Sequence, residues 1–239
     1  MNRGRAISTT ISLCLVASQS HALWDAAADF RSVNNPSGEW EYGYEPGKLA
    51  LLLPMAAPLV LGEGLVGWQA DTGEPWIVKN MNETTRTVGS AHLLAGQIAM
   101  RPGGVGPYVA LQFTAPTAGM YSWTASFTQR NTLPSSSDVY IVHNGTTLLW
   151  SGLSNSFDVP VPTSGSVKLE AGDRLSAVVG PDGSDLNDVT GVDFTIDSVP
   201  EPTSSTILGL GLAALLRRRK GNLRLGQKLD TDAERASQP

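Results

Sequence analysis

YVALQFT, residues 108–114, is followed by APTAGM and then by YSWTASFT, residues 121–128. In both outer segments apolar and polar side chains alternate with the period of two that is typical of a β-strand with one buried face. The proline and glycine between them are turn formers. The sequence therefore predicts two antiparallel strands, and we expect them to pair as a hairpin.

More short strands are predicted along the chain. Asn144-Gly145 suits a type I′ turn and predicts a second hairpin between residues 139–143 and 146–150. Further candidate strands are residues 40–44, 49–53, 65–69, 76–79, 157–161, 167–169, 174–179 and 189–196. Many short strands joined by Gly or Pro turns favour an all-β fold, an antiparallel jelly-roll-like β-sandwich.

Composition agrees with this fold class and excludes others. The chain has 239 residues, of which 25 are Gly, 15 are Pro and only 16% are charged. A single cysteine, Cys14, excludes an internal disulfide and a cysteine zinc site. Residues 23–202 hold 8 Lys or Arg against 19 Asp or Glu, a net charge of −11, which argues against a nucleic-acid partner.

The N-terminus has the layout of a secretory signal. Arg3 and Arg5 precede an apolar stretch at residues 7–17, and Ser20-His21-Ala22 supplies small residues before a cleavage site. We therefore expect residues 1–22 to be a signal peptide and the mature chain to start near Leu23. The alternative is an exposed, disordered N-terminus.

The C-terminal region combines three features in one order. Pro200-Glu201-Pro202 leads into an apolar segment, residues 203–216, which is followed by Arg217, Arg218, Arg219 and Lys220. This order resembles the PEP-CTERM sorting signal of Gram-negative bacteria, and the resemblance implies recognition by a membrane exosortase. A helix of 14 residues reaches only about 21 Å, short of the ~30 Å hydrocarbon core.

Together these observations predict four parts of the chain. We expect residues 1–22 to be the signal peptide, 23–198 the sandwich, 199–220 the sorting signal with a short transmembrane helix, and 221–239 a disordered tail. A buried core helix is the alternative for the apolar segment.

The middle of the chain also resembles domains of PEP-CTERM and related secreted bacterial proteins. The stretches that carry this resemblance are AAADF (26–30), NPSGEWEYGY (35–44), APTAGMYSWTASF (115–127), SDVYIVHNG (137–145), LEAGDRLSAVVG (169–180) and DVTG (188–191). They imply a jelly-roll-like sandwich without an assigned enzymatic activity.

Catalytic motifs give little support for an enzyme. GEGLVG, residues 62–67, matches a dinucleotide-binding pattern, but the Asp, Gly and Pro that follow oppose a helix, so a turn between strands is predicted. His92 and His143 have no Ser or Cys motif beside them. We expect no enzyme, although paired carboxylates of the glycosidase type stay open as an alternative.

Two stretches are candidate binding sites. Asp182, Asp185 and Asp188 crowd one loop, and such oxygen ligands favour calcium, the one cofactor the sequence suggests; ordinary turn formation is the alternative.

The second candidate is aromatic. Trp40, Tyr42 and Tyr44 alternate and so share one face of a strand, where they either stack on a sugar or pack in the core.

These observations predict an exported protein that passes through the inner membrane to the cell surface or the extracellular space. Its expected partners are an exosortase-like processing enzyme, the membrane before processing, and exopolysaccharide. We expect a structural or adhesive role in a biofilm matrix. A carbohydrate-binding module and a glycan-active enzyme are the alternatives.

Overall fold

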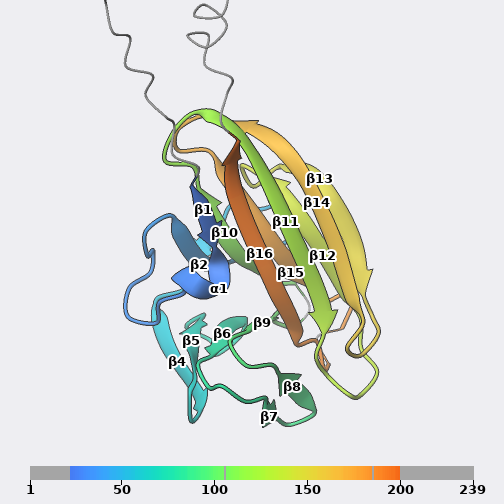
Figure 1. Cartoon of the computed structure of the whole chain (residues 1–239). Coiled ribbons are helices and arrows are strands. Elements are labelled where there is room, and N and C mark those ends of the chain that lie inside the picture. Colours follow the sequence, from blue (N-terminus) through green and yellow to red (C-terminus); the bar gives the residue numbers. More distant parts are fainter. Residues whose placement is uncertain (1–21, 105, 185, 200–239) are drawn as a thin grey trace, which may run out of the picture. The chain divides into compact units, whose positions relative to one another are not determined.

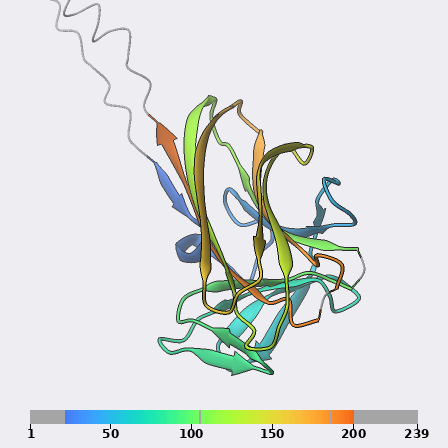
Figure 2. The same ribbon diagram turned by 90° about the vertical axis from the view of Figure 1, so that its right-hand side faces the viewer.

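The computed structural model describes residues 22–104, 106–184 and 186–199. Within these residues the chain forms two antiparallel sheets that pack face to face and one separate two-stranded hairpin (Figure 1, Figure 2). An antiparallel, jelly-roll-like β-sandwich, as predicted, is therefore confirmed.

The larger sheet has eight strands among the described residues. Their spatial order is β14 (Pro160–Leu169), β11 (Gly119–Gln129), β16 (Thr190–Val199), β9 (Ile98–Arg101), β6 (Trp76–Asn80), β5 (Leu65–Gln69) and β4 (Ala57–Gly62). The short strand β1 (Leu23–Asp25) also pairs with β16.

The second sheet has six strands in the described part of the chain. Their order is β13 (Thr147–Ser154), β12 (Ser137–His143), β15 (Arg174–Gly180), β10 (Tyr108–Thr114), β2 (Trp40–Glu45) and β3 (Leu53–Pro54). The separate hairpin consists of β7 (Arg86–Val88) and β8 (Ala91–Leu93). One short helix, α1 (Ala26–Asp29), begins after Asp25, whose carboxylate accepts hydrogen bonds from the backbone N–H groups of Ala27 and Ala28.

The core lies between the two sheets and is rich in aromatic rings. Trp40 of β2 contacts Phe113 of β10 and Phe194 of β16, with ring centroids 5.5 and 5.7 Å apart. All three side chains are buried. Removing a side chain of this size from water stabilises a fold by about 1.5–3 kcal/mol, so these contacts join the sheets strongly.

The first predicted hairpin is wrong. β10 pairs with β2 and β15 in the six-stranded sheet, whereas β11 pairs with β14 and β16 in the eight-stranded sheet. The intervening turn therefore crosses from one sheet to the other. Both apolar faces turn toward the core, where the rings of Phe113 and Tyr121 lie 5.9 Å apart. The alternation of buried and outward-facing side chains on each strand was predicted correctly, but the pairing of the two strands with each other was not.

The second predicted hairpin is confirmed. β12 and β13 pair antiparallel, with a bulge, and Asn144 and Gly145 take φ angles of 50° and 70°. Those angles are the ones a type I′ turn requires. In the GEGLVG segment Glu63 and Gly64 form the turn between β4 and β5, as predicted, and the flanking residues belong to those two strands.

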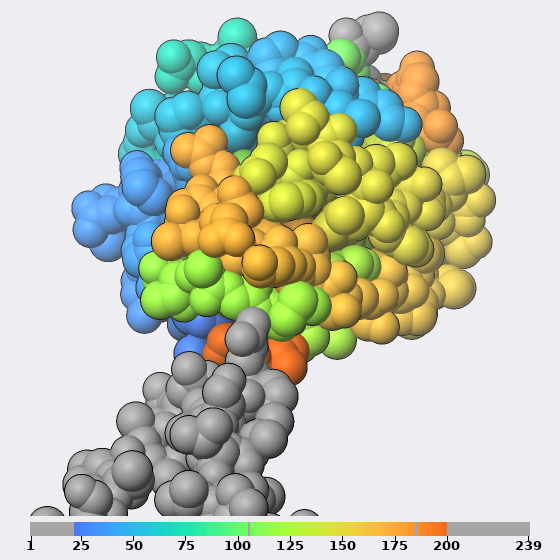
Figure 3. Space-filling view, turned by 90° about the horizontal axis from the view of Figure 1, so that it is seen from above, coloured from blue at the N-terminus to red at the C-terminus, as the bar shows by residue number. Residues whose placement is uncertain are grey.

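Residues 46–52 cover the outer face of the six-stranded sheet. Leu49 and Leu52 pack against a small apolar cluster that includes Tyr140, and the ammonium of Lys48 lies 4.2 Å from the centre of the Tyr140 ring. Figure 3 shows this light blue segment against the yellow-green region of β12 and β13. The strand predicted at residues 49–53 is wrong, because Leu49 has a φ of 58° and only Leu53–Pro54 forms a strand.

The chain enters and leaves the sandwich at neighbouring points. Ser198 donates its backbone N–H to the carbonyl of Ala22, and the N–H of Ala22 donates to Ser198 Oγ, each over 3.0 Å. These bonds continue the pairing of β1 with β16 (Figure 1).

Candidate functional site

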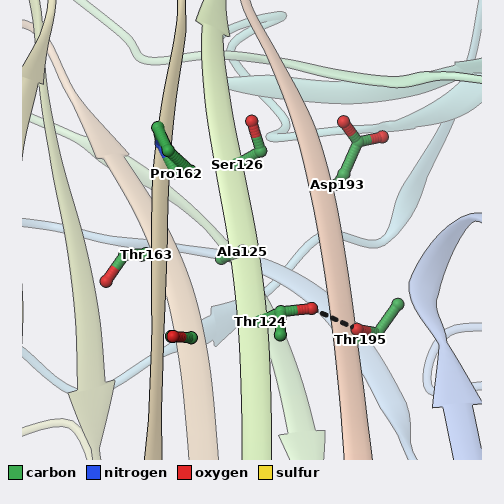
Figure 4. A pocket seen from close by; sticks show the side chains of 8 residues that line it. Thr124, Ala125, Ser126, Pro162, Thr163, Asp193 and Thr195 are labelled. Atoms are coloured by element: carbon green, nitrogen blue, oxygen red, sulfur yellow. Dashed lines mark hydrogen bonds between the residues drawn. The ribbon is translucent and has the colours of Figure 1, made fainter.

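A polar groove runs over the outer face of the eight-stranded sheet, on β14, β11 and β16. On β11 the inward residues Tyr121, Trp123 and Phe127 are buried, and the intervening Ser and Thr side chains point the other way. The same alternation on β16 places Asp193 and Thr195 on this face (Figure 4). A period of two in three neighbouring strands thus brings Ser, Thr and Asp side chains onto one face of the sheet.

The pairing register sets the groove side chains in two rows across the three strands. Pro162, Ser126 and Asp193 form one row, and Ser164, Thr124 and Thr195 form the other. Directly opposed side chains on antiparallel strands lie about 4.5–5.5 Å apart at Cβ, so each row presents its polar groups together. The groove has a volume of about 540 Å³ and is also lined by Ala125 and Thr163.

Two hydroxyl groups in the groove are already joined. Thr124 Oγ1 and Thr195 Oγ1 lie 2.6 Å apart and share a hydrogen bond (Figure 4). Each hydroxyl has one donor and two acceptor positions, so the pair keeps capacity for a further hydrogen-bonding molecule. The hydrogen bond between Thr124 and Thr195 also fixes the orientation of these two side chains in the groove.

Asp193 carries the negative charge of the groove. Its side chain is exposed, and among the described residues no basic side chain forms an ion pair with it. The neighbouring strands partly desolvate its carboxyl group and raise its pKa; the charge of Asp25 raises it further, while that of Arg130 lowers it. Asp193 is the only carboxylate among the eight lining residues.

The aromatic site predicted from sequence is corrected by the structure. Trp40 and Tyr42 are 1% and 0% exposed, and Tyr44 packs against the same core. The three side chains do share one face of β2, but that face points inward. Trp40 and Tyr42 therefore have no exposed ring surface on which a sugar can stack, and Tyr44 is partly buried against the same core.

The predicted calcium loop is only partly described. Asp182 accepts a hydrogen bond from Ser136 over 2.7 Å, and Asp188 is 1% exposed; Asp185 lies outside the described residues. Within the described part of the chain no group of three or more His, Cys, Asp and Glu side chains is placed to hold a metal ion. Calcium binding at this loop stays a prediction.

His92 and His143 are not among the residues that line the groove. His92 packs edge-on against Phe157, with ring centroids 5.7 Å apart. His143 Nε2 lies 3.5 Å from Asp173 Oδ2, beside the Asn144 turn, where Asn144 Nδ2 donates to Asp173 Oδ1 over 2.9 Å. Hydrogen bonds from the Glu170 backbone and from Asn144, followed by His143, hold the pKa of Asp173 below its usual range.

The sequence contained part of the groove without identifying it. The alternating pattern of residues 121–128 predicts one solvent-exposed face, which consists of Ser122, Thr124 and Ser126. Asp193 and Pro162 come from distant segments, and only the β14–β11–β16 pairing brings them beside Ser126.

Comparison with known proteins identifies the C-terminal region. The family model described as PEP-CTERM protein-sorting motif matches residues 198–220. The predicted motif residues Pro200, Glu201 and Pro202 and the basic residues at 217–219 fall in this match and lie outside the described residues. No curated protein matches the chain significantly.

Solved structures include several distant β-sandwiches. A family 35 carbohydrate-binding module from Clostridium thermocellum is 16% identical over 60% of this chain and 100% of its own, with a TM-score of 0.33. The CBM36-1 domain of a xylanase from the hindgut metagenome of Trinervitermes trinervoides is 11% identical over 54% and 99%, with a TM-score of 0.32. Pika GITRL is 16% identical over 39% and 75%, with a TM-score of 0.27. At these TM-scores the description of the fold rests on this chain's own strand pairing.

The strand pairing and the sorting motif together define an exported β-sandwich protein. More particularly, it carries a PEP-CTERM motif, the signal by which an exosortase sorts a secreted protein. Among the described residues no helix is both long and apolar enough to span a bilayer; the segment predicted to do so, 203–216, lies outside them.

Proposed function

We propose that this protein is sorted to the cell surface through its PEP-CTERM motif and there binds polysaccharide in the groove of the eight-stranded sheet. The observation that carries the proposal is the groove itself, an open channel about 540 Å³ in volume with Ser, Thr and Asp side chains on three adjacent strands. Binding at this surface gives the molecule an adhesive role, holding exopolysaccharide close to the cell.

The chemistry of the groove suits a chain of hydroxyl groups. Ser and Thr hydroxyls both donate and accept hydrogen bonds, as sugar hydroxyls do. The strands hold these groups in fixed rows, so binding orders few protein side chains and loses little entropy. An open groove accepts the middle of a long chain, whereas a closed pocket would accept only its end.

Binding is better supported than hydrolysis. A glycosidase needs two carboxyl groups on either side of the scissile bond. Asp193 alone supplies one from the residues that line this groove. The groove is therefore proposed as a binding surface, and the alternative of a glycan-active enzyme has no comparable support in it.

The test removes hydroxyl groups while keeping side-chain shape. The double variant Thr124→Val, Thr195→Val preserves β-branching, so the strands should keep their stability. Its binding to a panel of polysaccharides is compared with that of the unaltered protein by affinity electrophoresis. Thr147→Val, an exposed change on β13 of the other sheet, is the matched control.

We expect the double variant to bind at least about fivefold more weakly and the control to bind normally. Two lost hydrogen bonds of about 0.5–1.5 kcal/mol each account for this loss. Undiminished binding by the double variant would place the site elsewhere. Failure of the unaltered protein to bind any polysaccharide would overturn the proposed function.

A further inference from the structure

We infer that the groove selects a positively charged polysaccharide, one whose amino sugars carry free ammonium groups. This inference rests on the proposed function and names the class of ligand. It comes from the charges placed around the groove.

Asp193 supplies the negative charge of the groove. It lies beside Ser126 across the β11–β16 pair, and no Lys or Arg among the described residues forms an ion pair with it. Its side chain is open to solvent. An ammonium group that enters the groove can therefore pair with this carboxylate without displacing a basic side chain of the described residues.

A second carboxylate lies on the same face of the sheet. Asp25 of β1 is directly opposite Thr195, which places it on the outer face, and its charge acts on the carboxyl group of Asp193. Two negative charges therefore lie near each other where β1 pairs with β16.

The nearby basic groups do not reverse this charge. Lys168 lies at the far end of β14, opposite Met120, and its ammonium is 3.6 Å from Glu170 Oε1. Arg130 is 2% exposed, and its guanidinium donates to Asp158 Oδ1 and to the carbonyl of His92, each over 2.7 Å. Neither one presents a cation to a chain lying in the groove.

Three kinds of polysaccharide would experience this surface differently. A uronic-acid chain carries carboxylates, which the aspartates repel. A neutral chain gains only hydrogen bonds from the Ser and Thr rows. A chain with ammonium groups gains the same hydrogen bonds and a charge-assisted one to Asp193, which is the stronger kind. The order of affinity follows directly.

The experiment compares one sugar backbone in two chemical forms. Short glucosamine oligosaccharides and the same oligosaccharides after N-acetylation differ in their ammonium groups; an oligomer of a uronic acid is the third probe. Each is titrated into the full-length protein in mildly acidic buffer by calorimetry. Asp193→Asn is the test variant, and Asp71→Asn, the same loss of charge on an exposed turn, is its control.

We expect the glucosamine chain to bind about three- to fivefold more tightly than its acetylated form, because an exposed ion pair contributes an effect of that size. Asp193→Asn should abolish this difference between the two forms, whereas Asp71→Asn should preserve it. Added salt should weaken only the glucosamine complex.

Failures of the inference and of the proposed function look different. Equal binding of both forms, or a preference that survives in Asp193→Asn, overturns the inference but leaves polysaccharide binding standing. An equal loss in Asp71→Asn assigns the effect to net charge and also overturns it. If no oligosaccharide or longer polysaccharide binds, the proposed function itself fails.

Discussion

Replacing Glu45 by Gln should stabilise the protein at neutral pH while leaving its stability in acid almost unchanged. Glu45 ends β2 beneath the covering segment 46–52 and is 1% exposed. Its Oε2 atom accepts no hydrogen bond among the described residues. Burial raises the pKa of this carboxyl group to about 7, although the backbone N–H groups of Ala50 and Leu49 act in the opposite direction.

The size of the effect follows from proton linkage. The pKa rises from 4.5 to about 7 on folding, so between these values the folded chain keeps a proton that the unfolded chain releases. The free energy of unfolding then falls as the pH rises, by up to 1.36 kcal/mol per unit and about 3 kcal/mol in all. The contribution of the protonated carboxyl group is complete below pH 4.5 and is lost as the pH rises through about 7. The neutral amide of Gln has no such dependence.

Urea unfolding followed by tryptophan fluorescence measures the difference at a series of pH values. We expect the curves of unfolding free energy for the original protein and Glu45→Gln to meet in acid and to separate by about 2–3 kcal/mol at pH 8, the variant being the more stable. Glu63→Gln, on the exposed β4–β5 turn, is the control and should not reproduce this separation. Parallel curves for the original protein and Glu45→Gln from pH 5 to 8 would refute the burial of this carboxyl group.

Two other substitutions test packing and a buried cation. Gly67→Ala should cost about 1–3 kcal/mol of unfolding free energy or more, because an added Cβ would lie 2.0 Å from the backbone carbonyl oxygen of Ile77; Gly47→Ala, with nothing within 4 Å, should cost far less, and equal melting temperatures would contradict the close strand approach. Asp158→Asn should cost about 1–3 kcal/mol although its side chain is 62% exposed, since it weakens the hydrogen bond from the buried guanidinium of Arg130; an unchanged urea midpoint would show that this ion pair contributes nothing.

The sequence indicates the positions of the strands more clearly than it indicates which strands pair with each other. Alternation in residues 108–114 and 121–128 identifies both strands and their buried faces. It does not show whether the turn between them closes a hairpin or crosses the sandwich, because both arrangements bury Phe113 and Tyr121. Contacts with strands about 30 to 80 residues away decide the matter, and such contacts leave no local pattern.

Other departures have a similar cause. The apolar residues at 49–53 predict a strand, but they cover the outside of a sheet, and Leu49 adopts a left-handed backbone. The alternation of Trp40 and Tyr42 is correct, but periodicity does not show whether the shared face meets the core or the solvent. The groove is equally hidden, since Asp193 joins Ser126 only through the pairing of β16 with β11.

The position of β16 also determines how the molecule would carry mechanical load. This strand contributes Asp193 and Thr195 to the groove, and the sorting-motif match begins at residue 198, before the strand ends at Val199. Tension between a polysaccharide held in the groove and an anchor at the C-terminal end would leave the sandwich through the last residues of β16. Ten residue pairs to β11 bear that tension parallel to the strands, so their hydrogen bonds are loaded together in shear. The second sheet and its aromatic contacts would remain outside the path of the force.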